Sequence, residues 1–405
     1  MTEKAVKPEI RFAGFNDAWE QRKLGELGTI TTGSTPSTSI PDYYSDDGIV
    51  WVTPTDICEN ITFESARKLS DLGQQVGRVV PKNTILVTCI ASIGKNTMLG
   101  NTGSFNQQIN GLTPNENECD PYFLLTESAL WSAKMKSSAA AGTMQIVNRT
   151  EFSELKTWLP SLIEQQAISD FFRQLDNLIT LHQRKYDKLT KVKKSMLEKM
   201  FPKNGANVPE IRFKGFSDAW EQRKLGEVLT SLQNNTLSRA DLSSEQGIAK
   251  NVHYGDILVK FGEVIDVKTE SLPLIADEAV IAKYKSSFLQ NGDVIVADTA
   301  EDETVGKCTE IAGLGDEIVI SGLHTIPYRP VRKFASGYLG YYMNSVSFHN
   351  QLLPLMQGIK VTSISKTALQ NTDILYPKSA TEQAAIGTYF RNLDNFITLH
   401  QREPT

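Results

Sequence analysis

The chain contains EIRFAGFNDAWEQRKLGEL at residues 9–27 and, almost unchanged, EIRFKGFSDAWEQRKLGEV at residues 210–228. A second phrase also occurs twice, as EQQAISDFFRQLDNLITLHQR at 164–184 and as EQAAIGTYFRNLDNFITLHQR at 382–402. The two segments that these copies enclose resemble each other little. Repeated brackets around dissimilar inserts predict a pseudo-twofold molecule, in which a common frame carries two different surfaces.

Length and composition predict a globular protein of several domains. At 405 residues the chain exceeds one ordinary core, and two to three domains are expected. No apolar run approaches the roughly 20 residues that span a bilayer, so we expect no contact with a membrane. The four cysteines form no C-x-x-C pair, which favours a reducing cytoplasm over a disulfide framework or a zinc site.

Charge is distributed unevenly along the chain. The net charge of −5 argues mildly against nucleic-acid binding. Residues 182–203, however, hold eight lysines and arginines against Asp187 and Glu198. Any contact with DNA must therefore come from local basic faces, or be shared with a partner protein.

Residues 161–200 carry the strongest helical pattern, between Pro160 and Pro202. Their apolar spacing alternates between three and four residues, which is typical of a coiled-coil seam with two polar interruptions. A surface helix packed on one domain is the alternative; the seam favours a partner helix, with 382–402 as the obvious one. The seam positions are Ile168, Phe172, Leu175, Ile179, His182, Tyr186, Leu189, Lys193, Met196 and Met200.

The inserts mix short strands with helices, and they follow the same order of elements. Residues 122–135 and 337–354 are expected to be helical, and each helix leads through a polar stretch that contains glycine to an apolar segment and the repeated helix. We therefore expect one shared α+β fold. The predicted strands are 48–53, 83–89, 255–262, 292–298 and 318–328.

The chain lacks the sequence signatures of common enzymes. It has no phosphate-binding G-x-x-x-x-G-K-[ST] loop, no nucleophile elbow and no zinc-hydrolase histidine pair. Residues 120–123, Asp-Pro-Tyr-Phe, resemble the loop that grips a target adenine in methyltransferases. A helix start with Asp120 as N-cap and Pro121 in the first turn explains these residues fully, and we favour it.

Polar residues with DNA-binding chemistry occupy matching places in the two inserts. Gln and Asn side chains pair with an adenine edge, Arg pairs with guanine, and Ser, Thr and Lys suit phosphates. Each residue alone is more simply a solvated loop residue, but the matched placement favours DNA recognition. The run 106–108 and His324 belong to the same group. The candidates are Lys95, Asn96, Gln107, Gln145, Asn148 and Arg149 in the first half and Lys260, Lys307, Gln357, Lys360, Ser363 and Lys366 in the second.

The brackets themselves predict packing against the ends of the long helices. Their faithful repetition also allows two copies of one partner to dock on equivalent surfaces. The residues that we assign to partner docking are Trp19, Trp220, Phe172, Ile179, Tyr186 and Leu189.

The whole chain resembles the specificity (S) subunit of type I restriction–modification systems. One shared pattern is W-E-x-x-x-L-G-E, here Trp19–Glu26 and Trp220–Glu227. A second pattern opens the repeated helix, and its residues are Pro160, Glu164, Gln165, Ile168, Leu175 and Asp176, and again Pro377, Glu382, Gln383, Ile386, Leu393 and Asp394.

The resemblance implies two target recognition domains that are separated by long antiparallel coiled-coil helices. Each domain would read one half of a split double-stranded DNA target, and the helices would set the unread gap. This division places the first domain at 1–160, the first spacer helix at 161–203, the second domain at 204–378 and the second helix, short and apparently truncated, at 379–405.

The resemblance also implies that the chemistry belongs to other subunits. Two methyltransferase (M) subunits would bring S-adenosylmethionine, and restriction (R) subunits would bring ATP and Mg²⁺ chemistry. The chain itself would hold neither cofactor nor metal and would not be catalytic. The alternatives are a coiled-coil adaptor that binds only proteins, and a self-contained DNA methyltransferase or nuclease.

One departure from the family concerns the second helix. After His400 the chain holds only five residues, whereas the first helix continues from His182 through a basic half. We therefore expect one end of the coiled coil to be unpaired, with part of the Lys185–Met200 seam exposed or covered by another chain. Full assembly of a restriction complex would then be in doubt.

Overall fold

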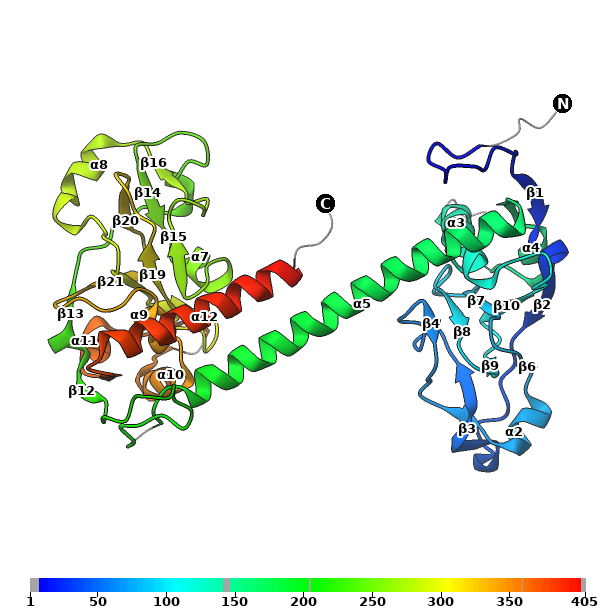
Figure 1. Ribbon diagram of the computed structural model, residues 1–405, viewed down its shortest axis with the longest axis horizontal. Helices are drawn as coiled ribbons and strands as arrows, with labels where there is room; N and C mark the ends of the chain where they lie inside the picture. The colour runs from blue at the N-terminus through cyan, green and yellow to red at the C-terminus, as the bar shows by residue number, and fades with distance from the viewer. Residues whose placement is uncertain (1–6, 141–145, 204, 359, 402–405) are drawn as a thin grey trace. The chain divides into compact units, whose positions relative to one another are not determined.

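The computed structural model describes residues 7–140, 146–203, 205–358 and 360–401 (Figure 1). The chain divides into two compact units, Met1–Thr180 and Leu181–Thr405. Each unit contains one insert and one copy of the bracket. Within the described ranges, no helix combines the length and the apolar character that a membrane crossing requires.

The first unit is built on a five-stranded sheet. The central strand, β7 (Ile85–Thr88), is buried along its full length, and α3 (Pro121–Ala140) packs on it. Burial of the whole strand explains the sequence Ile-Leu-Val-Thr, which is apolar without alternation. Neighbouring strands are antiparallel except for the last pair. The order is β2 (Gly28–Thr32), β10 (Ile109–Pro114), β7 (Ile85–Thr88), β8 (Asn96–Leu99) and β4 (Ile61–Thr62).

A four-stranded sheet completes the first insert. Val52, Leu86 and Phe105 from the two sheets are fully buried in one apolar cluster, so the two sheets share a core. The order is β5 (Lys68–Leu69), β3 (Tyr44–Val52), β9 (Gly103–Phe105) and β6 (Val79–Val80), with η1 (Pro41–Tyr43) and α2 (Asp71–Val76) in the connections.

The second unit repeats this topology. Its last strand pair, β15–β19, is parallel like β4–β8, and its β14–β20 pair is parallel like β3–β9. The main sheet runs β13 (Leu229–Ser231), β21 (Thr325–Pro330), β17 (Val294–Ala297), β19 (Cys308–Ala312) and β15 (Val264–Asp266), and the smaller one β16 (Leu274–Ile275), β14 (Ala249–Val252) and β20 (Ile318–Ser321).

The helices of the second insert lie in its connections and on its main sheet. The shared α+β fold that we predicted for the inserts is therefore confirmed. The helices are η2 (Arg239–Asp241), α7 (Tyr254–Val259), α8 (Glu278–Lys283), η3 (Lys285–Ser287), α9 (Tyr338–Met343), α10 (Val346–Leu352) and η4 (Leu353–Leu355).

Each bracket forms a strand and one helical turn that close their unit. In both units the bracket strand pairs antiparallel with the strand that runs directly into the long helix. Equal sequence therefore produces equal structure at this position. The elements are β1 (Glu20–Lys23), α1 (Leu24–Leu27) and β11 (Lys156–Leu159) in the first unit, and β12 (Glu221–Lys224), α6 (Leu225–Val228) and β23 (Asp373–Tyr376) in the second.

A buried carboxylate fastens each bracket to its helix. Arg11 Nε and Nη2 each lie 2.7 Å from an oxygen of Glu164, and the indole N–H of Trp19 donates to the same carboxylate. The glutamate side chain is only 2% exposed. A buried charge needs such a partner, and the bidentate geometry explains why this partner is an arginine.

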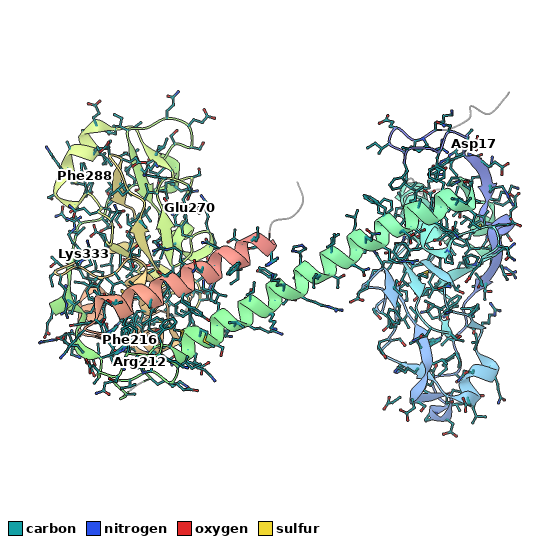
Figure 2. The ribbon with its side chains drawn as sticks, in the orientation of Figure 1. Asp17, Arg212, Phe216, Glu270, Phe288 and Lys333 are labelled. Carbon is teal, nitrogen blue, oxygen red and sulfur yellow. The ribbon has the colours of Figure 1, made fainter. Side chains whose placement is uncertain are left out.

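The same clamp occurs in the second unit. Arg212 bonds Glu382 at 2.7 and 2.9 Å, and Trp220 donates to the same carboxylate. Arg212 therefore lies beside the first turn of α12 (Ala380–Gln401), where Figure 2 labels it. The next residue of each repeat is also buried and accepts a backbone N–H: Gln165 from Asp120, and Gln383 from Ala335.

The long helix α5 (Leu162–Lys199) contains 38 residues. Its C-terminal half runs alongside α12, shown in green and red in Figure 1. Nδ1 of His182 lies 2.8 Å from Nδ1 of His400, and Lys193 Nζ lies 2.6 Å from an oxygen of Asp394. The residue numbers run in opposite directions, so the predicted antiparallel pairing of the repeated helices is confirmed.

Three sequence-based expectations about secondary structure were wrong. The strand expected at 318–328 is two strands, β20 and β21, which a turn at 322–324 separates. Residues 255–262 form mainly the helix α7 instead of a strand, because Ile257 and Phe261 both face the core while Val259 is 87% exposed. That four-residue spacing is helical. The helix expected at 337–354 breaks at Asn344, where Ser345 caps a second helix.

The prediction of an exposed Lys185–Met200 seam was also wrong. Tyr186, Leu189 and Met196 are partly buried and Met200 is 3% exposed, because α12 packs along this half of α5. The exposed apolar side chains lie in the other half of the helix. They are Ile163 (71% exposed), Phe171 (47%), Phe172 (41%), Leu175 (37%), Leu178 (51%) and Ile179 (59%).

Candidate nucleic-acid interface

Three connections meet at one end of the main sheet in the first unit. They are the β7–β8 loop, the three-residue β9–β10 turn, and the segment that leads into α4 (Arg149–Glu154). Cys89 N donates to Gln108 O over 2.7 Å, and Val147 N donates to Cys89 O over 3.0 Å. These bonds join the three connections into one surface.

The second unit joins the equivalent connections in the same way. Asp298 N donates to His324 O over 3.1 Å, and Ile364 N donates to Asp298 O over 2.9 Å. A short ladder of β18 (Thr299–Ala300) with β22 (Thr362–Ser363) corresponds to a bridge between Ile90 and Ile146 in the first unit. Equal backbone bonds therefore hold different side chains: Cys89 corresponds to Asp298, and Gln108 corresponds to His324.

The β9–β10 turn of the first unit presents amide side chains. Gln107 is exposed, and the hydroxyl of Thr35 donates to its side-chain oxygen. Gln108 is half-buried, and its side-chain oxygen accepts from Asn106 Nδ2 over 3.1 Å. Because amides both donate and accept, this turn has the chemistry of direct adenine readout.

The equivalent turn of the second unit presents an imidazole. His324 has a φ of 54°, a left-handed conformation that is uncommon outside glycine. Its Nδ1 lies 3.5 Å from an oxygen of Asp298, and its ring lies 5.2 Å from that of Tyr254. The side chain is nevertheless 47% exposed. A strained and oriented surface residue of this kind marks a candidate functional position.

Three of the predicted DNA-contacting residues, Asn148, Arg149 and Lys366, lie at the starts of two short helices. Asn148 caps α4 by accepting from Glu151 N over 3.0 Å, so its side chain has a structural role. In the second unit Ser365 caps α11 (Lys366–Gln370) in the same way. Arg149 and Lys366 are thereby the first residues of equivalent helices, and both are exposed.

The predicted lysines Lys95 and Lys307 are structural equivalents. Lys95 Nζ donates to Pro54 O over 3.0 Å, and Lys307 Nζ donates to Leu258 O over 2.9 Å. Burial lowers the pKa of Lys307. Each ammonium therefore ties the loop in front of its strand, β8 for Lys95 and β19 for Lys307, to a carbonyl of another segment.

The remaining predicted residues differ in their surroundings. The side chain of Asn96 donates to Ser128 on α3, away from the surface. Lys260 lies at the end of α7, and its Nζ donates to the backbone carbonyl of Ser271. Gln357 and Ser363 pair through their backbones at 2.8 and 2.9 Å, and Lys360 is exposed between them. Gln145 lies outside the described residues.

The structure therefore brings together most, but not all, of the predicted positions. The sequence reasoning overlooked Thr35, Tyr254, Asp298 and Thr299, which adjoin the same surfaces. Position in the topology was the missing signal, because these residues follow strands whose neighbours were not yet known. The predicted positions that share these surfaces are Lys95, Gln107, Asn148 and Arg149 in the first unit and Lys307, Gln357, Lys360, Ser363 and Lys366 in the second.

Residues 120–123 form the start of a helix, as the capping interpretation predicted. The Asp120 carboxylate accepts from the backbone N–H groups of Tyr122 and Phe123, each over 2.9 Å, and Ser169 donates to it. One oxygen, Oδ1, accepts all three bonds and thus holds the helix start and Ser169 together. Within the part of the chain that the structure describes, no three His, Cys, Asp or Glu side chains gather in a way that could hold a metal ion.

The residues assigned to partner docking fall into two groups. Trp220 is 4% exposed and belongs to the core, and Tyr186 and Leu189 are half-buried at the α12 pairing. Phe172 and Ile179 are exposed on the first half of α5. Accessible apolar surface at these positions therefore belongs to the first unit.

Comparison with known protein families identifies the repeated units. The sequence signature of the type I restriction modification DNA specificity domain matches residues 16–191 and 217–405. The chain belongs to this family. Both matches include the tryptophan and the glutamate of a clamp, Trp19 with Glu164 and Trp220 with Glu382, so the family signature follows the repeated architecture.

Several similar proteins are named as specificity subunits of type I restriction enzymes. The MjaIX specificity subunit of Methanocaldococcus jannaschii is 27% identical over 52% of this chain and 51% of its own length. The HindI specificity subunit of Haemophilus influenzae is 29% identical over 40% of this chain and 37% of its own length. This chain therefore spans about half, or less, of these two relatives.

Solved structures share the fold across almost the whole chain. A type I restriction-modification S subunit from M. genitalium has a TM-score of 0.53 at 13% identity, covering 98% of this chain and 94% of its own. A chain from a study of assembly of the type I R-M system also has a TM-score of 0.53, at 17% identity, covering 97% and 93%. The predicted fold class and family are thus confirmed.

Proposed function

We propose that this chain is the DNA-reading subunit of a type I restriction–modification complex, and that each unit reads one half of a split duplex target. One observation carries the proposal: equal backbone bonds hold the same three connections in both units, while their side chains differ. A constant scaffold with variable side chains is what two independent sequence readers require.

The proposal assigns base contacts to the turn residues. Gln107 and Gln108 would read the first half-site, and His324, beside Asp298, the second. Arg149 and Lys366 would contact phosphates, since both are exposed and begin equivalent helices. Helices α5 and α12 would set the length of the unread gap.

Catalysis in this proposal belongs to partner subunits. Two methyltransferase subunits would bring S-adenosylmethionine to adenine, and restriction subunits would bring ATP and Mg²⁺. The capping role of Asp120 supports this division, because the adenine-gripping motif that it resembles would need its carboxylate. The complex would act in the cytoplasm, which suits the four free cysteine thiols.

The test is to map methylated adenines in a genome that carries this chain with its methyltransferase partner. We expect Gln108→Ala to relax one half of the recognised sequence and His324→Ala only the other half, because each loses about 1–3 kcal/mol of discrimination at the bases it reads. Lys82→Ala is the control, since this exposed residue precedes β7 at the opposite end of the sheet. An unchanged target in both variants, or binding without sequence preference as a protein adaptor would show, contradicts the proposal.

A further inference from the structure

An apolar pocket opens beneath the bracket of the first unit. It has a volume of about 690 Å³ and lies between the bracket and the start of α5. Trp19, Phe123 and Phe172 line it, together with the carboxylate-bearing Glu127. Phe172 is 41% exposed although it is a large apolar residue, so this surface has the composition of an interface.

The second unit shows what occupies the equivalent position. Phe201, which follows α5, is fully buried there; its ring lies 6.2 Å from Trp220 and from Tyr338, and stacks 5.8 Å from Phe390. Phe390 is fully buried too, whereas its counterpart in the repeated phrase, Phe172, is exposed.

The aromatic frame around the two positions is the same. Trp19 and Phe123 meet edge-to-face at 5.9 Å and 71°, and Trp220 and Tyr338 at 6.0 Å and 63°. Outside them, the edge-to-face pair Phe12–Phe171 at 5.8 Å matches Phe213–Tyr389 at 5.9 Å. Among the described residues of the first unit, no side chain takes the place that Phe201 has in the second.

Polar contacts also hold the end of α5 against the bracket of the second unit. Ile211 N donates to Lys199 O over 2.9 Å, and Lys199 Nζ lies 3.4 Å from Glu210. The repeat places Glu9 and Ile10 at these two bracket positions, and Ile10 is 91% exposed. The first bracket thus offers the same backbone N–H and the same carboxylate to a helix end.

We infer that the first unit binds, from another polypeptide segment, an amphipathic basic helix that ends in a Met-Phe pair, as the second unit binds residues 185–201 of its own chain. The phenyl ring would enter the pocket at Trp19 and Phe172, and the helix would cover the exposed apolar residues of α5. This interaction is separate from DNA reading and does not rest on it.

The chemistry of the occupant follows from the lining. Lysines of the helix would face Glu9 and Asp176, the counterparts of Glu210 and Asp394, each of which pairs with a lysine of α5 in the second unit. A methionine beside the phenyl ring would fit the irregular apolar wall. A second copy of this chain is a poorer source, because its own Phe201 is already fully buried.

A labelled synthetic peptide of residues 185–201 tests the inference against the full chain by fluorescence anisotropy. We expect one peptide per chain, and an affinity about tenfold or more lower when Phe201 of the peptide is replaced by alanine, since a buried phenyl ring is lost. Phe172→Glu in the chain should weaken binding similarly. Leu130→Glu, at a residue 57% exposed on α3, is the matched control and should leave the affinity unchanged.

A photoreactive phenylalanine analogue at peptide position 201 supplies an independent measurement, and we expect it to label residues that line the pocket. Equal affinity for the Phe172→Glu chain, or labelling confined to the second unit, would overturn the inference. The inference would also be overturned if a peptide held in helical form by a chemical staple did not bind the chain. A dimer of the chain that Phe172→Glu dissociates, and that the peptide cannot disrupt, would assign this face to a second copy instead.

Discussion

Buried carboxylates explain which residues the two halves share and where they differ. Glu164 and Glu382 occur in both halves because each carboxylate, 2% exposed, must keep an arginine and a tryptophan beside it. Among the described residues, no arginine forms an ion pair with Glu310. It accepts from the backbone N–H groups of Gly337 and Gly340, and burial raises the pKa of its carboxyl to about 7.

Glu310 should make the stability of the second unit depend on pH. Because its pKa in the folded state lies above the ordinary value, its contribution is fully present below about pH 4.5 and is lost as pH rises through about 7. Relative to Glu310→Gln, the native chain should lose up to about 3 kcal/mol of unfolding free energy between pH 5 and pH 8. Urea unfolding at the two pH values measures this difference.

The exposed Glu303→Gln variant is the control, and its difference from the native chain should not change with pH. A constant difference between the native chain and Glu310→Gln across the same range would show that the carboxyl titrates normally.

At the scale of elements, the pairing of α5 with α12 depends on one lysine within an apolar seam. Lys193 Nζ lies 2.7 Å from an oxygen of Glu263 and 2.6 Å from one of Asp394, and its side chain is 18% exposed. It also lies 5.8 Å from the ring centre of Tyr341. The lysine thus ties two helices and the insert together, and it places a specific polar contact where an apolar residue would allow the helices to slide.

Lys193→Ala should destabilise the second unit by about 2 to 3 kcal/mol, because two carboxylates lose their common cation. The exposed neighbour Lys194→Ala should change stability by less than about 0.5 kcal/mol. Chemical unfolding followed by circular dichroism compares the two variants. Equal effects of both substitutions would contradict a specific role for Lys193.

At the scale of the whole molecule, the apolar cores divide between the units. Two clusters contain only residues of Met1–Thr180 and three contain only residues of Leu181–Thr405. Separate cores are expected to melt separately, even when a continuous helix joins them.

Calorimetry should therefore resolve two transitions that respond to different substitutions. Arg11→Ala leaves Glu164 buried without its cation and should lower one transition, and Arg212→Ala should lower only the other, each by about 10 °C. Arg223→Ala is the control, since that side chain is 55% exposed. A single transition that both clamp variants shift equally would mean that the units unfold as one.

Much of the architecture could be predicted because it repeats. The brackets, the long helix and the common order of elements were all visible as two copies of one pattern. The α7 segment was misjudged because Gly-Asp-Ile-Leu-Val has strand-like composition, and only the burial of Ile257 and Phe261 reveals its helical spacing. The DNA-contacting residues were found in part, because polar loops reveal their chemistry but not their neighbours.

Local sequence by itself determined the duplicated frame, the helix ends and the family, since periodicity, caps and motifs act over a few residues. Only tertiary structure decided which loops share a surface and which half of α5 is covered. Those facts depend on strand order and helix pairing between residues that lie far apart in the sequence, as His182 and His400 do. Phe172 and Phe390 show this most directly: the repeat gives them equivalent positions, yet one is exposed and the other is buried by Phe201.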